Sequence, residues 1–328
     1  MLNDFRKVII LLALATFGSP VLSYSQALTF PKTVPPGDYS GIAWLGGSRF
    51  AVACDKSKAG FFVFDIRIDS VSGRIFSVSN EGFKSCGLPC RDQEGIAWFP
   101  PDSTVFICGE KDNEVLEYDA GGCPTGRRLQ MPGVFKSSSS NLGIESLTYN
   151  ACTQRFWITS ESTLPDDGER ASSTNGTSNL LRLQSFETSL SPAEYYYYKM
   201  DKPKATRAAA IYAMGVSEMC ALDDGRLLVL EREFFVPRRK IGAWVECKLF
   251  VVNPEAAQPE TVLPKSLLWQ NHTRLNLTNR SLANYEGMCL GPRLKNGKRV
   301  VVLVSDSQHG YKKMLKDWFL TLTVADGQ

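Results

Sequence analysis

The chain repeats one pattern of short apolar runs and turn residues five times. Each copy opens with a polar or acidic residue, a small or acidic one and an apolar one, as in Glu94-Gly95-Ile96 and Glu286-Gly287-Met288. The other copies open at Ser40, Glu145 and Ser217. Self-similarity of this kind along one chain is the signature of a repeat architecture.

A turn and further apolar runs follow each opening. The turns are rich in Gly, Asn, Asp and Pro, as at Asp223-Asp224-Gly225 and Asn296-Gly297, and such dipeptides favour tight hairpins. The later runs are dominated by β-branched and aromatic residues, which predicts strands. The second run of every copy leads into an acid: Asp55, Glu110, Glu161, Glu231 and Asp306.

Five copies of a three- or four-stranded meander predict an all-β fold, a β-propeller, because radial repetition protects the sheet edges. We read five blades, and the longer insertions leave room for a degenerate sixth. The last copy lacks a fourth strand, so we expect residues 28–34 to supply it and close the ring. A pair of β-sandwiches is the competing architecture, but it does not demand the same register in every unit.

The first 27 residues read as a targeting segment. Arg6 and Lys7 precede an apolar run at residues 8–17 that is too short to span a bilayer, and Ser25-Gln26-Ala27 gives a small-x-small cleavage pattern. We therefore expect a signal peptide at residues 1–27 and a propeller domain at residues 28–328. The mature protein would be secreted or periplasmic, with no membrane span.

Composition narrows the possible partners. Charged residues make up 22% of the chain and the net charge is only +3, with no basic run interleaved with aromatics as in nucleic-acid grooves. Phosphate-binding loops, dinucleotide fingerprints and a Gly-x-Ser-x-Gly elbow are absent from the sequence. We expect a monomer that does not bind nucleic acid.

The nine cysteines add one constraint. In an exported chain some of them should form disulfides, and an odd number leaves at least one thiol unpaired in a monomer. Cys86 and Cys90 flank Gly87-Leu88-Pro89, a tight loop that a disulfide between them would close on itself.

The repeat register predicts a cluster of carboxylates. In a propeller the first strand of each blade lines the central channel, so acids at equivalent positions should converge near its axis. Converging carboxylates repel one another unless a cation is present, and numerous hard oxygen ligands suit Ca²⁺. The predicted ligands are Glu94, Glu145, Glu218, Glu231, Glu286 and Asp306, with Arg232 as counter-charge and with neutral oxygens from Asn141 and Asn284. For any one of these acids, a solvated or turn-capping role is equally plausible.

The ordered set of motifs resembles the phytase-like propeller family, described as having esterase-like activity. The segments that carry the resemblance span nearly the whole mature chain: Glu94-Gly95-Ile96-Ala97, Gly143-Ile144-Glu145-Ser146-Leu147, Ser217-Glu218-Met219, Leu227-Leu228-Val229-Leu230-Glu231-Arg232, Glu286-Gly287-Met288 and Leu303-Val304-Ser305-Asp306. Ser40 and Ser217 depart from the family pattern, because Glu would be expected at both.

The resemblance implies an exported, calcium-assisted hydrolase of phosphate or other esters that activates water at the channel mouth. It implies catalytic roles for Glu94, Glu145 and Glu286, with Arg232 contacting an anion. We expect Glu286 to matter more for activity than Glu161. Two alternatives stay open: a calcium-dependent lactonase-like propeller, and a non-catalytic propeller that binds a ligand or partner and uses its acids structurally.

Overall fold

The fold is all-β throughout the part of the chain that the computed structural model describes, residues 23–24, 28–29, 34–35, 37–137, 143–279, 281–308, 314–315 and 318–325. These residues form 21 strands in five antiparallel sheets. The three helices among them are 3-10 turns, η1 (Gly133–Ser137), η2 (Pro165–Asp167) and η3 (Pro254–Ala256). No helix in this part of the chain has the length and apolarity to cross a membrane.

Each of the first four sheets is a blade of four consecutive strands. In chain order the strands are β3 (Tyr39–Gly46), β4 (Arg49–Cys54), β5 (Phe61–Ile68) and β6 (Ile75–Lys84) in blade 1; β7 (Gln93–Phe99), β8 (Thr104–Gly109), β9 (Glu114–Tyr118) and β10 (Pro124–Arg128) in blade 2; β11 (Ile144–Asn150), β12 (Arg155–Ser160), β13 (Leu180–Glu187) and β14 (Pro192–Lys199) in blade 3; and β15 (Ile211–Ala221), β16 (Leu227–Val236), β17 (Trp244–Val252) and β18 (Lys265–Arg274) in blade 4.

The fifth blade joins the two ends of the chain, as the repeat count predicted. It contains β19 (Tyr285–Arg293), β20 (Arg299–Ser305) and β21 (Trp318–Val324), and the short strands β1 (Ser23–Tyr24) and β2 (Leu28–Thr29) both pair with β21. Of the expected 28–34 segment, Leu28 and Thr29 pair with β21, whereas β1 lies within the expected signal peptide. The fold is therefore a five-bladed propeller, and no sixth blade forms within the described residues.

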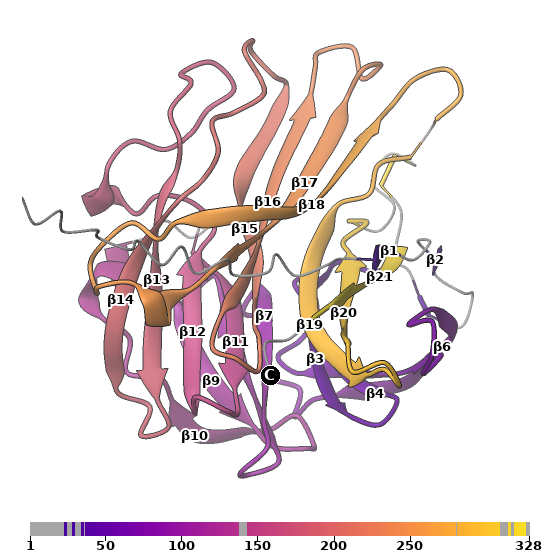
Figure 1. Ribbon diagram of the computed structural model, residues 1–328, viewed down its shortest axis with the longest axis vertical. Coiled ribbons are helices and arrows are strands. Elements are labelled where there is room, and N and C mark those ends of the chain that lie inside the picture. The colour runs from indigo at the N-terminus through magenta and orange to yellow at the C-terminus, as the bar shows by residue number, and fades with distance from the viewer. Residues whose placement is uncertain are drawn as a thin grey trace, which may run out of the picture.

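The five inner strands surround the axis in chain order. β3, β7, β11, β15 and β19 each contact the next, and β19 contacts β3 (Figure 1). A hydrophobic cluster fills each of the five blade interfaces, for example where Phe106 of blade 2 meets Phe156 of blade 3 with ring centroids 4.7 Å apart. In Figure 1 the hairpin between β16 and β17 extends to the top of the view.

A shift of strand register marks the opening motif of every inner strand. The pairing slips between Gln93 and Ile96 in β7 and between Tyr285 and Gly287 in β19, and it slips at the corresponding point of β3, β11 and β15. Such bulges re-aim side chains and increase local twist. The repeated motif is therefore a repeated bulge at one height of the axis.

Glycine at the second motif position lets the inner strands approach closely at this height. A Cβ added to Gly95 would clash with the backbone nitrogen of Leu147, and one added to Gly287 would lie 3.0 Å from the carbonyl carbon of Gly41. In blade 4 the equivalent residue is Glu218, which is completely buried. The second motif residues therefore form a plug that divides the predicted central channel into two mouths. The plug consists of Gly41, Gly95, Ser146, Glu218 and Gly287.

The disulfide does not close the short loop between Cys86 and Cys90. Cys86 bonds to Cys123, so the bridge ties the segment after blade 1 to the turn between β9 and β10 of blade 2. The Cys90 thiol instead donates to the Asp55 carbonyl at 3.0 Å. Propeller geometry brings Cys123 beside Cys86, which sequence spacing does not reveal. Unpaired thiols, expected from the odd count, are present.

The close approach of the inner strands yields a stability prediction. Gly95→Ala should lower the free energy of unfolding by about 1–3 kcal/mol, because the added methyl group meets backbone atoms that cannot rotate away. Gly133→Ala is the matched control, since an added Cβ there meets no heavy atom within 4 Å. Urea unfolding of both variants is the measurement; equal stability of the two would contradict the plug.

Candidate functional site

The end of the axis where the inner strands begin carries the carboxylates, and we call it the acidic mouth. Four backbone hydrogen bonds place the residue after each second strand opposite the residue before each inner strand: Asp55 N to Asp38 O, Glu110 N to Asp92 O, Glu161 N to Gly143 O and Asp306 N to Asn284 O. These acids are structurally equivalent. They share the mouth with the first motif residues Glu94, Glu145 and Glu286.

In blade 4 the acid that follows the second apolar run is one residue away from the position equivalent to Asp55, Glu110, Glu161 and Asp306. Its equivalent position, opposite Gly215, is Arg232 and not Glu231. Because neighbouring strand residues point to opposite faces, Glu231 faces away from the axis. There its carboxylate accepts hydrogen bonds from Tyr198 Oη at 2.7 Å and Lys265 Nζ at 2.5 Å. The structure therefore does not bring Glu231 to the other predicted ligands.

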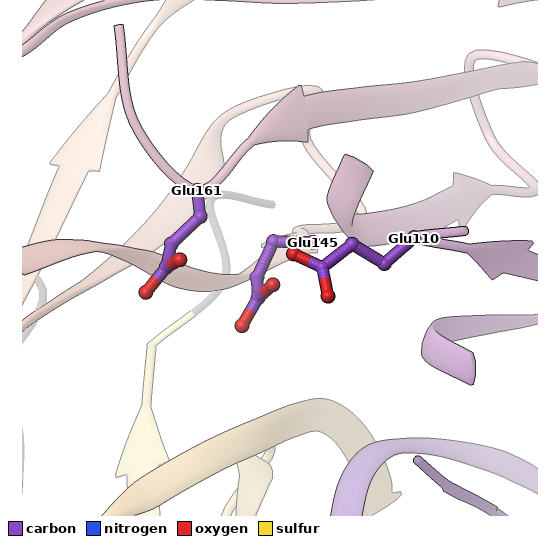
Figure 2. Close-up of side chains that lie close together, drawn as sticks. All are labelled: Glu110, Glu145 and Glu161. Atoms are coloured by element: carbon purple, nitrogen blue, oxygen red, sulfur yellow. The ribbon is translucent and has the colours of Figure 1, made fainter. Parts of the chain in front are cut away.

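Three carboxylates lie closest together at the acidic mouth. One oxygen each of Glu110, Glu145 and Glu161 lies within 4.8 Å of the others, and Figure 2 shows the three groups side by side with that of Glu110 turned toward Glu145. Glu145 comes from β11, whereas Glu110 and Glu161 follow β8 and β12. Blades 2 and 3 thus build this three-carboxylate group.

Arg232 connects this group to blade 5. One terminal nitrogen of its guanidinium donates to Glu161 at 2.7 Å, and the other forms an ion pair with Glu286 and reaches Asn284 Oδ1 at 3.3 Å. Asn284 also donates to Glu286 at 2.9 Å. Only 7% of Arg232 is exposed, so its main role is to hold two carboxylates of the mouth together.

Lysines neutralise a different part of the mouth. Lys56 forms ion pairs with Asp55 and Asp92, and Lys111 pairs with Asp92 at 2.9 Å. Within the described residues no cation forms an ion pair with Glu110 or Glu145. Of the three carboxylates, only Glu161 therefore has an ion-pair partner among the described residues.

Burial and mutual repulsion favour the protonated form of these acids. Burial, reinforced by the Glu145 charge, raises the pKa of Glu94 well above its usual range. Burial raises the pKa of Glu145 in the same direction, with Glu161 adding to the effect and Arg232 opposing it. Burial also raises the pKa of Glu110 to about 7 and that of Asp306 to about 8. These shifts show how strongly the apo mouth resists full ionisation.

Glu218 lies at the plug and is fully buried there. Its Oε1 accepts hydrogen bonds from the backbone nitrogens of Leu147 at 3.2 Å and Met219 at 3.0 Å. Burial raises the pKa of Glu218 well above its usual range, which favours a neutral acid. Glu218 is not part of the group formed by Glu110, Glu145 and Glu161, although its charge acts on Glu145.

The two serines that depart from the repeat have a structural explanation. Ser40 Oγ donates to the Gln93 carbonyl at 2.5 Å, and Ser217 Oγ donates to the Tyr285 carbonyl at 3.2 Å. Each hydroxyl therefore bonds an inner strand to that of the next blade. Serine replaces a charge by an interblade hydrogen bond at these two positions.

The acidic mouth brings together Glu94, Glu145, Glu286 and Asp306 of the predicted site, with Arg232 and Asn284. Sequence reasoning did not rank Glu110 and Glu161 among the metal ligands, although both end second strands in the shared register. The shared register was the feature of the sequence that could have identified these two residues as ligands. Asn141 lies outside the described residues.

The oxygen positions fit a calcium ion. Ca²⁺ binds carboxylate oxygens at about 2.3–2.6 Å, so a single ion can bridge atoms separated by up to roughly 4.8 Å. The three oxygens of Glu110, Glu145 and Glu161 meet this limit. A site of three protein ligands also leaves coordination positions for water or substrate oxygens.

Comparison with known proteins identifies one family. A family model described as "Phytase-like: Esterase-like activity of phytase" matches residues 34–309, which is most of the chain. No curated protein matches the chain.

Solved structures that are similar to this chain include three proteins whose sequence identity to it is low. A streptogramin B lyase is 11% identical, with 91% of this chain and 97% of that chain covered and a TM-score of 0.40. A member of the DUF4221 family from Bacteroides vulgatus is 8% identical, with coverage of 94% and 99% and a TM-score of 0.42. A gluconolactonase from Xanthomonas campestris is 11% identical, with coverage of 93% and 95% and a TM-score of 0.36. Similarities of this size support no functional argument.

The raised pKa values predict how stability depends on pH. Acids whose folded pKa exceeds the unfolded value stabilise the fold below the unfolded pKa, and that contribution is lost as pH rises through the folded pKa. With a chelator present, the free energy of unfolding should therefore fall by about 2 kcal/mol or more between pH 5 and pH 8.5, the range that contains the values near 7 for Glu110 and near 8 for Asp306.

Urea unfolding at several pH values measures this dependence. Glu110→Gln should flatten it, whereas Glu187→Gln, at an exposed end of β13, should leave it unchanged. A stability that rises over this pH range would contradict the prediction, because it would mean that folding lowers the pKa values of these acids.

Proposed function

This chain belongs to the phytase-like family, described as having the esterase-like activity of phytase, and on that premise we propose an exported, calcium-assisted hydrolase of phosphate or other esters. The reaction takes place at the acidic mouth. The observation that carries the proposal is the three-carboxylate group, in which Glu110, Glu145 and Glu161 place oxygens within 4.8 Å of one another.

Charge distribution supports a cation at this group. The lysines of the mouth pair with Asp55 and Asp92, and the guanidinium of Arg232 reaches only Glu161 of the three. A divalent ion would relieve the remaining repulsion and allow Glu110 and Glu145 to ionise. When bound, Ca²⁺ supplies charge stabilisation to a phosphoryl or carbonyl oxygen and lowers the pKa of a bound water.

The other residues of the mouth have separate tasks. Arg232 positions Glu161 and Glu286, because each of its two terminal nitrogens forms an ion pair with one of them. Glu94 borders Glu145, and burial raises its pKa well above the usual range, which favours its protonated form. We assign Glu94 the role of general acid, which donates this proton to the alkoxide that leaves when the ester bond breaks.

This arrangement changes the expected ranking of the acids. Glu161 belongs to the three-carboxylate group, whereas Glu286 is separated from it by Arg232. We therefore propose that Glu161 contributes at least as much as Glu286 to metal binding. Arg232 is a positioning residue, because its two terminal nitrogens are engaged by protein carboxylates and an amide oxygen.

Substitution of the proposed ligands tests the function. Glu145→Gln and Glu161→Gln should each lower calcium-dependent turnover by about 100-fold, because each removes a ligand charge from the metal. Turnover of an aryl phosphate, an aryl acetate and a lactone, with calcium and with a chelator, is the measurement. Calcium affinity is measured by calorimetry on the same variants.

Glu231→Gln is the matched control for the register. It also replaces a glutamate at the end of a second strand, but its side chain lies on the other face of β16 with Tyr198 and Lys265. It should leave calcium affinity unchanged. Loss of calcium binding in this variant would contradict the site, and chelator-sensitive turnover of the lactone alone would favour the lactonase alternative. If none of the substrates is turned over, the result would favour the alternative of a non-catalytic propeller that binds a ligand or partner.

Export is a separate part of the proposal. Cleavage after Ala27 would leave Leu28 as the first residue, so β2 would remain available to pair with β21. Mass spectrometry of protein recovered outside the cytoplasm should find this N-terminus. A mature chain that retains residues 1–27 would contradict cleavage.

A further inference from the structure

One end of blade 4 projects beyond the level of the acidic mouth. β15 begins at Ile211 and β16 ends at Val236, whereas the mouth lies at the level of Gly215 and Arg232. At about 3.3 Å per strand residue, the four extra residues carry this end of the blade about 13 Å beyond the mouth. The hairpin between β16 and β17 forms the top of the view in Figure 1.

Three segments of the chain meet at this projecting end. We call them together the basic tip: residues 206–211, 237–243 and 274–278. The backbone nitrogen of Gly242 donates to the Leu275 carbonyl at 3.1 Å, which joins the second segment to the third. A cavity of about 270 Å³ is lined by residues of all three segments, including Arg207, Gly242 and Arg274. The basic tip is therefore one continuous surface.

The charged side chains of the basic tip are all positive. Its three segments contain no aspartate or glutamate, and their basic residues are Arg207, Arg238, Arg239, Lys240 and Arg274. All five residues are exposed, and within the part of the chain that the structure describes none of them forms an ion pair. Their positive charge is therefore available to a partner.

Two acids lie on the strands below the basic tip, and both are buried and engaged. The Glu246 carboxylate accepts hydrogen bonds from Lys204 Nζ at 2.5 Å and from Gln270 at 3.0 Å. The Glu233 carboxylate accepts from the backbone nitrogens of Lys204 at 2.9 Å and Ala205 at 3.0 Å. With these two acids and Lys204 included, the five cations of the tip still leave a net charge of +4.

Large aliphatic side chains are exposed among these cations. Ile241 follows Lys240 directly and is 77% exposed, Leu277 is 89% exposed, and Ile211 is 40% exposed. A surface that gathers exposed apolar groups often marks a site of interaction. Basic and apolar side chains together are what peripheral segments use to bind anionic lipid, through attraction and shallow insertion.

The cavity of the basic tip suits a lipid headgroup. Lys204, Arg207 and Arg274 line it, whereas no described acid does. The Arg207 guanidinium lies 5.4 Å from the centre of the Phe235 ring, which stacks on the Trp244 ring with centroids 5.5 Å apart. Guanidinium groups match the geometry of phosphate oxygens. The cavity therefore offers charge and hydrogen-bond donors to the phosphate of a headgroup.

We propose that the basic tip docks the protein on an anionic lipid surface. The five cations attract the headgroups, Ile241 and Leu277 enter the boundary between headgroups and acyl chains, and the cavity receives a phosphate. A soluble polyanion would use the cations and not the exposed aliphatic residues, so the observations favour lipid. This site is independent of the metal and of the proposed hydrolase activity.

The acidic mouth does not oppose this docking. It lies about 13 Å farther from the lipid than the basic tip, whereas charges in water are screened over about 8 Å at physiological ionic strength. Because the mouth and the tip lie at the same end of the propeller, docking turns the mouth toward the lipid.

Flotation with vesicles tests the proposal on the mature chain of residues 28–328, which keeps every described strand except β1. A chelator keeps metal out of the acidic mouth. Vesicles of phosphatidylglycerol and phosphatidylcholine in equal amounts should carry the protein at about 0.1 M salt and release it at about 0.5 M, because salt screens the attraction. Vesicles of phosphatidylcholine alone should not carry it. No flotation with the anionic vesicles, or equal flotation with both kinds, would overturn the proposal.

Removal of the charges at the turn of the β16–β17 hairpin tests the electrostatic part. The triple variant Arg238→Ser/Arg239→Ser/Lys240→Ser should bind anionic vesicles about 100-fold more weakly, since each basic residue near such a surface contributes about a factor of five. These residues are exposed in a turn, so the variant should keep the melting temperature of the wild type.

A second triple variant is the matched control for net charge. Arg74→Ser/Lys295→Ser/Lys298→Ser removes the same charge from the turns before β6 and between β19 and β20, at the opposite end of the axis. It should bind anionic vesicles within about 3-fold of the wild type, because charges far from the lipid are screened. An equal loss in both triple variants would overturn the assignment to the basic tip.

An aliphatic substitution separates a lipid surface from a soluble polyanion. Ile241→Ser should weaken vesicle binding about 10-fold, because it removes an apolar group that enters the lipid, and should leave binding to dextran sulfate unchanged. Leu267→Ser is the matched control, because Leu267 is 51% exposed but lies near the start of β18, at the other end of that strand.

Vesicle binding that Ile241→Ser leaves unchanged would overturn docking on lipid and favour a polyanion, provided that the tip triple variant is impaired. Failure of the hydrolase assays would leave this result untouched, since no calcium or turnover is involved.

Discussion

Repulsion among carboxylates held at one mouth is the constraint on which this structure depends. The inner strands pack closely through glycine, so the acids that precede and follow the bulges cannot move apart without breaking the ring. The fold relieves the repulsion in two ways within the described residues, with the lysines beside Asp55 and Asp92 and with Arg232 between Glu161 and Glu286. Protonation relieves what remains, as the raised pKa values of Glu94 and Glu145 indicate. A cation that displaced these protons would stabilise the ionised mouth, which links ligand binding, pH and stability in one site.

The repeat motif determines how the axis is divided. Its first residue supplies carboxylates to the acidic mouth, and its second forms the plug. Selection for a closely packed ring thus accounts for the recurring glycines without any functional role. The acids have no such packing reason, because Ser40 and Ser217 show that a neutral hydroxyl suits the same position and even bonds the neighbouring blade.

The sequence was sufficient to predict five blades, the inner position of the repeated motif and closure by the N-terminal segment, because each depends on a pattern repeated along the chain. It was insufficient where a shift of one residue changes the face of a strand. Leu-Glu-Arg at the end of β16 offers Glu231 or Arg232 to the mouth, and only the pairing of Arg232 with Gly215 decides between them. The Cys86–Cys123 bond was similarly hidden, since it depends on how two blades meet in space.

Location of a bound ion tests the central claim most directly. A crystal of the protein soaked in terbium, which substitutes for calcium and scatters anomalously, should show one anomalous peak about 2.3–2.6 Å from oxygens of Glu110, Glu145 and Glu161. The same experiment would reveal whether Arg232 keeps its contacts with Glu161 and Glu286 when the ion is bound. An acidic mouth without a peak, or an ion bound only at surface carboxylates outside the mouth, would contradict the account.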